Sequence, residues 1–197
     1  MHEIVIDEKI SCIPATEDPL SADIGIIREG GEVWLFDAGA DERAIEGLTG
    51  TYSIVLSHFH QDHIGNLGRL AVRQAYVSRE TGRHTGFGQT VTDDVFIGSL
   101  HIFPLPSNHC KGCLGLEIDE KYAFSGDALY GRFRDGCRVF NATLLKDQIE
   151  TLKRLRAPSL LLSHYPGLVR PRQEVIRELE AIYEKREKNG SSRKSVE

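Results

Sequence analysis

The sequence predicts an α/β fold of the α+β kind, in which antiparallel groups of strands are interspersed with helices. Three observations support this prediction. Short apolar runs end at turn signals, glycine makes up 19 of the 197 residues, and two later segments repeat apolar side chains at helical spacing. At roughly 150 residues per domain, we expect one domain over 1–188, followed by a polar, disordered tail over 189–197.

The expected elements follow one another with recognisable boundaries. The first 40 residues are typical of strands, and Gly30-Gly31 separates the apolar runs 24–27 and 33–36, which predicts a hairpin. Further strands are expected at 53–57, 75–78 and 159–163, and hairpins over 95–105 and 114–124. Helices are expected at 41–48, 64–70, 144–155 and 171–188, with a glycine-rich loop over 79–94.

Composition and charge exclude several classes of protein. The net charge of −5, from 24 basic and 29 acidic residues, argues against nucleic acid as a partner. We expect no contact with a membrane, because no run of about 18 apolar residues occurs. The first residues lack the pattern of a signal peptide, so we expect a cytoplasmic protein with reduced thiols. A small molecule is the expected partner, and a homodimer is compatible with the sequence.

The densest cluster of reactive side chains lies at 57–63, Ser-His-Phe-His-Gln-Asp-His, directly after a short apolar strand. In an extended segment, residues i and i+2 point the same way, so His58 and His60 can bind one metal ion. Asp62 and His63 follow where the chain turns into a helix, so they can face a second ion. Imidazole and carboxylate groups together suit zinc, with iron or manganese as alternatives.

Three later residues are further candidate ligands. His109, Asp127 and His164 each follow an apolar run, at the point where a strand leaves the core. Individually each signal is weak, because Asp127 in a Ser-Gly-Asp segment also fits an ordinary turn.

Taken together, these segments resemble the metallo-β-lactamase fold superfamily, and in detail its glyoxalase II-like branch with two metal ions. The matching segments are the HxHxDH motif at 58–63, His109 before Gly112, Ser125-Gly126-Asp127, Ser163-His164, and Leu35-Phe36-Asp37-Ala38-Gly39 as the early aspartate motif. The resemblance extends from about residue 22 to 168 and implies a four-layer αββα sandwich, with the metal ions in a groove at one edge of the two sheets.

The resemblance also implies a ligand set. It places His58, His60 and His109 on a first metal ion, and Asp62, His63 and His164 on a second. Asp127 bridges both ions. Asp37 resembles a residue that orders the metal-binding loop, although a turn-forming aspartate would fit there equally well. The implied cofactors are two divalent ions, with zinc favoured.

The charges of such a site suggest a hydrolytic mechanism. Two divalent ions, two carboxylate ligands and one hydroxide leave a net charge of +1, which suits a carbonyl substrate. The ions lower the pKa of bound water from 15.7 towards roughly 7. We expect a hydroxide that bridges the ions to attack an ester, thioester, lactone or amide carbonyl, with Asp62 and Asp127 in the catalytic set. Tyr130 and Tyr165 are candidate hydrogen-bond donors to the oxyanion, although half-buried tyrosines without a catalytic role fit equally well.

Alternatives stay open at this point. Cys110-Lys111-Gly112-Cys113 has the spacing of a redox dithiol, and it departs from the family pattern after the metal-binding histidine. A second hypothesis is therefore an iron redox enzyme that resembles persulfide dioxygenases. A phosphodiesterase and a non-catalytic metal-binding module are further hypotheses. Glyoxalase II carries an extra helical region after its last histidine, and here 33 residues follow His164. We expect specificity to lie in 79–94, 130–136 and the last helix.

Overall fold

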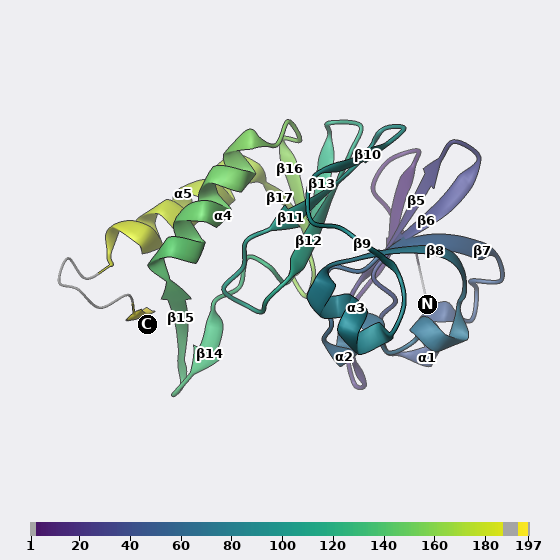
Figure 1. Ribbon diagram of the computed structural model, residues 1–197, viewed down its shortest axis with the longest axis horizontal. Helices are drawn as coiled ribbons and strands as arrows, with labels where there is room; N and C mark the ends of the chain where they lie inside the picture. Colours follow the sequence, from purple (N-terminus) through teal and green to yellow (C-terminus); the bar gives the residue numbers. More distant parts are fainter. Residues whose placement is uncertain (1–2, 187–192, 197) are drawn as a thin grey trace.

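The computed structural model describes residues 3–186 and 193–196, and its core consists of two mixed sheets packed face to face (Figure 1). The first sheet has the order β1-β2-β5-β6-β7-β8-β9. Its strands are β1 (Ile4–Val5), β2 (Ile10–Ile13), β5 (Ile24–Glu29), β6 (Glu32–Phe36), β7 (Thr51–Val55), β8 (Ala71–Val77) and β9 (Gln89–Thr90). The predicted hairpin at Gly30-Gly31 is confirmed, since β5 and β6 pair antiparallel across it.

The second sheet has the order β10-β11-β12-β13-β16-β17. Its strands are β10 (Val95–Ile97), β11 (Leu100–Leu105), β12 (Cys113–Ile118), β13 (Tyr122–Gly126), β16 (Ser159–Leu162) and β17 (Val169–Pro171). Both predicted hairpins of this region are confirmed by the β10–β11 and β12–β13 pairs. Neighbouring strands run antiparallel except β13 and β16, which run parallel.

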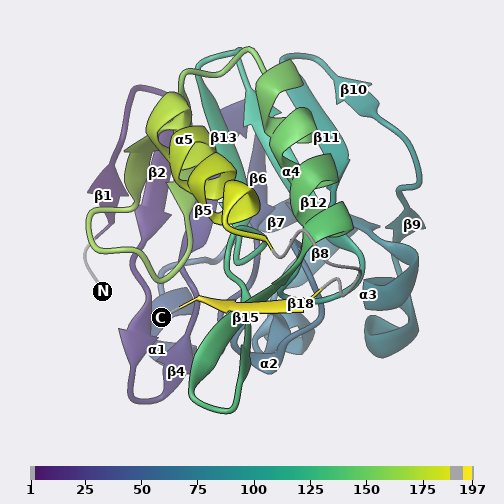
Figure 2. The same cartoon turned by 90° about the vertical axis from the view of Figure 1, so that its left-hand side faces the viewer.

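Helices cover the outer faces of the two sheets. The helices are α1 (Glu42–Ile45), α2 (Gln61–Ile64), a 3-10 turn (Leu67–Arg69), α3 (Arg79–Thr85), α4 (Ala142–Arg154) and α5 (Arg172–Glu184). The long helices α4 and α5 lie side by side on the second sheet in both views (Figures 1 and 2). Among the described residues, no helix is long and apolar enough to cross a membrane.

Three apolar clusters fill the three spaces between the four layers. The central cluster joins the sheets, and in it Phe36 of β6 stacks on Phe124 of β13 with ring centroids 4.9 Å apart. A second cluster joins α4 and α5 to the second sheet, and a third contains side chains of the first sheet and of α1. Gly25 is required at the centre, because a Cβ there would lie 2.6 Å from Phe124 Cζ. The predicted four-layer αββα arrangement is therefore confirmed.

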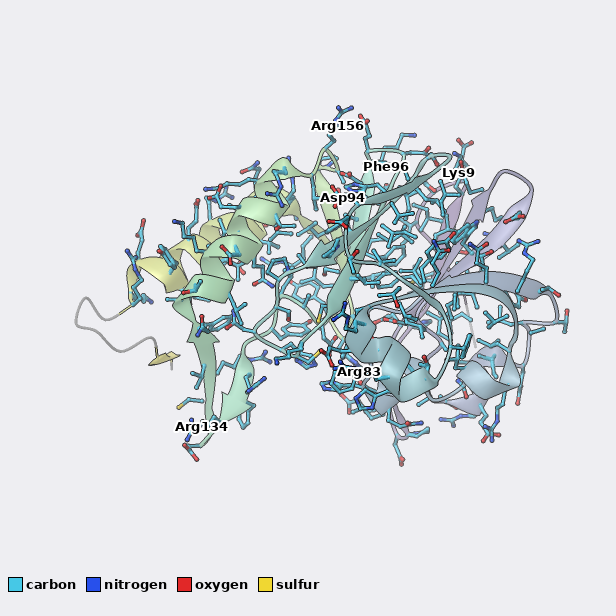
Figure 3. The ribbon with its side chains drawn as sticks, viewed as in Figure 1. Lys9, Arg83, Asp94, Phe96, Arg134 and Arg156 are labelled. Atoms are coloured by element: carbon cyan, nitrogen blue, oxygen red, sulfur yellow. The ribbon has the colours of Figure 1, made fainter. Side chains whose placement is uncertain are left out.

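Two small hairpins extend from the sandwich. One pairs β3 (Thr16–Glu17) with β4 (Leu20–Ser21), and the other pairs β14 (Arg132–Arg134) with β15 (Cys137–Asn141). Figure 3 shows Arg134 at the far end of the second hairpin, away from the body of the molecule. Of the tail expected to be disordered, 189–197, only 193–196 is described; its backbone forms β18 (Arg193–Val196) beside β15. The other residues of that prediction lie outside the described residues.

Two predictions about the fold are wrong. No helix spans 64–70, because α2 ends at Ile64 and only Leu67–Arg69 forms a 3-10 turn. The segment 79–94 was expected to be a loop, but Arg79–Thr85 forms helix α3. Ser78 starts the helix, because its Oγ accepts a hydrogen bond from the Thr81 amide at 3.1 Å. Gly86 ends it in the left-handed conformation, with a φ of +75°. Gly82, which lowered the helical signal of the sequence, lies inside the helix.

Candidate metal centre

The candidate ligands converge because they follow strands that end at the same edge of the sandwich. The 57–63 segment leaves β7, Asp127 follows β13, and His164 follows β16. Strands β6 and β7 run parallel, as do β13 and β16, so the carboxyl ends of each pair lie together. Three groups of potential ligand atoms lie within 4.8 Å of one another: His58, His60 and Cys110; His58, His109 and Asp127; and Asp62, His63, Asp127 and His164.

We call His58, His60 and His109 the first cluster. These histidines have low proton affinity. His60 Nδ1 and His109 Nε2 lie 2.9 Å apart, and the buried ring of His58 contacts both rings edge-on. Burial lowers the pKa of all three side chains, that of His58 well below its usual range. Burial therefore favours the neutral imidazole, the form in which histidine binds metal ions.

The second cluster, Asp62, His63 and His164 with the adjoining Asp127, brings carboxylates against histidines. Asp62 Oδ2 lies 3.1 Å from His164 Nε2 and 3.6 Å from His63 Nε2. Asp127 Oδ2 lies 3.5 Å from His63 Nε2 and 3.6 Å from His109 Nε2, so it stands between the two clusters. Burial alone would lower the pKa of His63, but Asp37 and Asp127 outweigh it and raise that pKa to about 10. This cluster therefore has a strong affinity for positive charge.

Asp37 holds the 57–63 loop in place. Its carboxylate is fully buried and accepts hydrogen bonds from the Ser57 amide, the Ser57 hydroxyl and His63 Nδ1, each at 2.7 Å. With Nδ1 engaged in this way, His63 turns Nε2 towards Asp62 and Asp127. Contacts of this kind fix the orientation of histidines that bind metal ions. Asp37 adopts a φ of +64°, which non-glycine residues rarely do.

Asp23 has a corresponding role at His164 and was not predicted from the sequence. Its Oδ2 accepts hydrogen bonds from the His164 amide at 2.9 Å and from Ser163 Oγ at 3.2 Å. Its Oδ1 accepts one from the Ala15 amide at 3.0 Å. Because these partners come from distant parts of the chain, no local motif marks Asp23. His164 itself has a φ of +56°, so these contacts hold it in a rare conformation.

The donor set passes a physical test for metal binding. Eight buried side-chain atoms have no hydrogen-bond partner among the described residues, and three of them are His58 Nε2, His63 Nε2 and Asp127 Oδ1. Buried polar atoms without partners are rare in folded proteins, and an ion is one of the few explanations. All three atoms belong to the two clusters, and their nitrogen and oxygen chemistry suits zinc.

Two cavities adjoin the clusters. The first, of about 700 Å³, reaches from Asp62 and His164 to the β3–β4 hairpin, where Thr16, Glu17 and Leu20 line it. The second, of about 520 Å³, lies beside Asp127. It is lined by His109, Asp127, Tyr130, Gly131, Phe133, Arg138, His164 and Tyr165. Of the segments expected to carry specificity, 130–136 lines the second cavity through Tyr130, Gly131 and Phe133, whereas 79–94, all of it described, lines neither cavity.

The two tyrosines predicted as oxyanion donors differ in their surroundings. The Tyr130 hydroxyl donates to the Ser163 carbonyl at 2.7 Å, which leaves it no hydrogen for a substrate in this arrangement. Burial and the nearby Asp127 raise the pKa of Tyr130 to about 12. Tyr165 is 37% exposed and lines both cavities, with the Arg170 guanidinium 5.1 Å from its ring. Of the two, Tyr165 is free to meet a substrate.

No family profile matches the sequence. A hydroxyacylglutathione hydrolase of Haemophilus ducreyi is 28% identical over 158 residues, which are 75% of this chain and 64% of that protein. The chain thus spans less than two thirds of the length of this curated relative.

Solved structures are similar over nearly the whole chain. The DIM-1 metallo-β-lactamase superposes with a TM-score of 0.72 at 12% identity, over 93% of this chain and 96% of that one. An archaeal metallo-β-lactamase superfamily protein from Sulfolobus tokodaii gives a TM-score of 0.62 at 17% identity, over 94% and 90%. The mono-zinc form of the FIM-1 metallo-β-lactamase from Pseudomonas aeruginosa gives 0.66 at 16% identity, over 93% and 95%.

Proposed function

Because the chain has the metallo-β-lactamase fold, we propose that it is a metal-dependent hydrolase that cleaves a carbonyl compound of low molecular mass. The observation that carries this proposal is the set of partnerless buried atoms, His58 Nε2, His63 Nε2 and Asp127 Oδ1, in two adjoining His/Asp clusters. Such a donor set supports metal binding, and the adjoining cavities give a substrate access to it.

The proposed ligands divide between two ions. His58, His60 and His109 would hold the first, while Asp62, His63 and His164 would hold the second. Asp127 would contact both, since it lies between the clusters. Zinc is our preferred ion because its usual ligands are imidazole nitrogen and carboxylate oxygen. When bound, the two ions supply water of lowered pKa and a positive field that polarises the substrate carbonyl.

Asp62 is our candidate for moving protons. Its side chain is 17% exposed, against 9% for Asp127, and it lines the cavity of about 700 Å³. A carboxylate in that position can accept the proton of the attacking water and pass it to the leaving group. The 3.1 Å contact with His164 Nε2 keeps Asp62 Oδ2 oriented.

Tyr165 is our candidate for contact with the substrate carbonyl. It is half-exposed, it lines both cavities, and it follows His164 directly in the chain. A hydroxyl there can donate to the oxygen on which negative charge develops. Arg138 lines the second cavity, where it can hold an anionic end of the substrate.

Among the carbonyl compounds, we favour thioesters. The relative from Haemophilus ducreyi is named a hydroxyacylglutathione hydrolase, and the hydrolysis of a thioester fits the same ligand set. An iron redox enzyme is a second candidate, favoured by one observation: Cys110 Sγ lies within 4.8 Å of the ligand atoms of His58 and His60. Thiolate is a soft ligand that also suits iron.

The test is a comparison of hydrolysis with and without metal. Protein stripped by a chelator and protein reloaded with zinc are assayed with an acyl thioester, an aryl ester, a lactone and a phosphodiester. We expect zinc-dependent cleavage of the thioester, abolished in His60→Ala and Asp127→Ala. A His101→Gln variant, which alters a histidine outside the clusters, serves as the control. Full activity in both ligand variants, or activity only in iron-loaded protein with a persulfide and oxygen, would overturn the proposal.

A further inference from the structure

Two thiols meet in the connection between β11 and β12. Cys110 follows His109 directly, and Cys113 is the first residue of β12. Their Sγ atoms lie 3.5 Å apart, and both residues are buried free cysteines, Cys110 with 6% and Cys113 with 3% of its surface exposed. The proposed hydrolytic function uses neither thiol.

The backbone between the thiols is held in the shape that brings them together. Gly112 adopts a φ of +73°, and a Cβ there would lie 2.6 Å from Ser78 Oγ. Only glycine therefore fits at this position without displacing a neighbour. The Leu114 amide donates to the Ser57 carbonyl at 2.8 Å, which ties the connection to the metal-binding loop.

One sulfur of the pair faces the candidate metal centre. Cys110 Sγ lies within 4.8 Å of potential ligand atoms of His58 and His60. A ligand atom of His58 in turn lies within 4.8 Å of ligand atoms of His109 and Asp127. Cys110 is also the chain neighbour of His109, so a shift of its backbone would displace His109. A change in the thiol pair can therefore reach the first cluster through this peptide bond.

We propose that Cys110 and Cys113 form a redox-active dithiol that hydrogen peroxide closes to a disulfide, and that closure weakens metal binding at the first cluster. The second half of this proposal rests on the proposed metal centre. Cys110 Sγ attacks a peroxide oxygen, the O–O bond breaks, and the departing oxygen takes up a proton and leaves as water. Cys113 Sγ then attacks Cys110 Sγ and displaces the remaining oxygen as a second water. The two thiols lose two electrons, which reduce one peroxide to two waters.

The geometry favours this oxidant and this consequence. A disulfide bond is about 2.05 Å long, so the sulfurs must approach each other by roughly 1.5 Å from their present 3.5 Å. Hydrogen peroxide is close to water in size, and it can therefore reach a residue that is only 6% exposed. The approach draws Cys110 towards Cys113 and with it shifts the backbone that carries His109.

The sequence provides a direct assay for the disulfide. Lys111 lies between the two cysteines, so trypsin cuts the chain there and yields the peptides 84–111 and 112–121. The zinc-loaded full chain is treated with hydrogen peroxide, alkylated, digested and analysed by mass spectrometry. We expect the two peptides joined after oxidation and separate after treatment with dithiothreitol. Cys137→Ser removes the more exposed thiol and should keep the link, whereas Cys113→Ser should abolish it. Separate, alkylated peptides after peroxide treatment of the wild type would overturn the dithiol.

A second measurement tests the connection to the metal centre. Zinc affinity is determined by competition with a chromophoric chelator, for reduced and for oxidised protein. We expect oxidation to lower the affinity for the more weakly bound zinc ion about 10-fold. This is the lower end of the usual effect of disturbing the residues around a metal ion. Cys113→Ser should show no such change. A joined peptide pair with unchanged zinc affinity would overturn the coupling alone. Absence of zinc binding in the reduced form would instead refute the proposed metal centre, while the peptide assay still decides on the dithiol.

Discussion

At the scale of single residues, the candidate centre depends on side chains that hold the imidazole rings in place. Asp37 is the clearest case, because its buried carboxylate accepts three hydrogen bonds from the metal-binding loop. We predict that Asp37→Asn lowers zinc affinity by about 10- to 100-fold, the usual effect of removing a residue that orients a ligand. Asparagine tolerates the left-handed backbone, so the fold should persist. Unchanged zinc affinity, with native circular dichroism, would refute this role.

Tyr165 allows a test of substrate contact. We predict that Tyr165→Phe lowers kcat for the thioester by up to about 10²-fold, because a hydrogen-bond donor to the oxyanion is lost. KM and zinc content should change little. Tyr130→Phe is the matched comparison, since its hydroxyl is bound to the Ser163 carbonyl. A loss of kcat for Tyr130→Phe but not for Tyr165→Phe would reverse the two assignments.

A third prediction concerns how the stability of the fold depends on pH at His101, a residue outside the two clusters. His101 Nδ1 is 3.1 Å from Glu117 Oε2, and its Nε2 is 3.4 Å from Asp94 Oδ2. Figure 3 shows Asp94 in the upper part of the molecule, away from the β14–β15 hairpin. Burial lowers the pKa of His101, but Glu117 and Asp94 outweigh it and raise that pKa above the ordinary 6.5. Burial raises the pKa of Glu117, whereas His101 and two backbone amides lower it below 4.5 overall.

The sign of the pH effect follows from these shifts. A raised histidine pKa stabilises the fold fully below pH 6.5, and this stabilisation is lost as pH rises through the folded pKa. The lowered Glu117 pKa stabilises the fold above pH 4.5 and loses this effect in acid. We predict that His101→Gln costs on the order of 1 kcal/mol more stability at pH 6 than at pH 9, measured by urea unfolding. Equal costs at both pH values would contradict the ion pair.

How far the sequence reveals the site depends on how local each signal is. His58, His60, Asp62 and His63 share one short segment, and their spacing alone predicts two clusters. The contacts that orient them form between strands distant in the sequence. Ser57 therefore carried no signal of its contact with Asp37, and Asp23 none of its contact with His164.

At the scale of elements, α4 has a distinct start. Asn141 Oδ1 accepts hydrogen bonds from the amides of Thr143 at 3.0 Å and Leu144 at 3.1 Å. We predict that Asn141→Ala costs about 1 kcal/mol of unfolding free energy, the usual value of a lost helix cap. Asn141→Asp keeps an acceptor there and should cost much less. Similar losses for both variants would show that the cap contributes nothing.

The elements that the sequence predicted are those with a strong apolar pattern. The β5–β6 and β12–β13 hairpins and the helices α4 and α5 are all recognisable in the sequence from their apolar patterns and turn residues. The β3–β4 hairpin consists of two-residue strands, and β14 has the sequence Arg-Phe-Arg. Such elements bury little surface and leave no periodic signal. They nevertheless wall the two cavities, and of the segments expected to carry specificity only 130–136 includes such an element, β14.

At the scale of the whole molecule, the candidate ligands join the two sheets. The 57–63 segment leaves the first sheet, while His109, Asp127 and His164 follow strands of the second. Ions held between them would stabilise the folded state by mass action, by about 2.7 kcal/mol at a free metal concentration of 100 Kd. We predict that removal of zinc lowers Tm by roughly 5–11 °C for a chain of this size. An unchanged Tm after chelation would mean that the sheets are not joined through metal ions.

The most direct test of the account is the metal content of protein purified from balanced medium, measured by elemental mass spectrometry alongside Asp127→Ala. We predict about two zinc ions per wild-type chain, and fewer in the variant because it lacks the carboxylate between the clusters. One iron per chain, or wild-type zinc content in Asp127→Ala, would contradict the two-ion hydrolase.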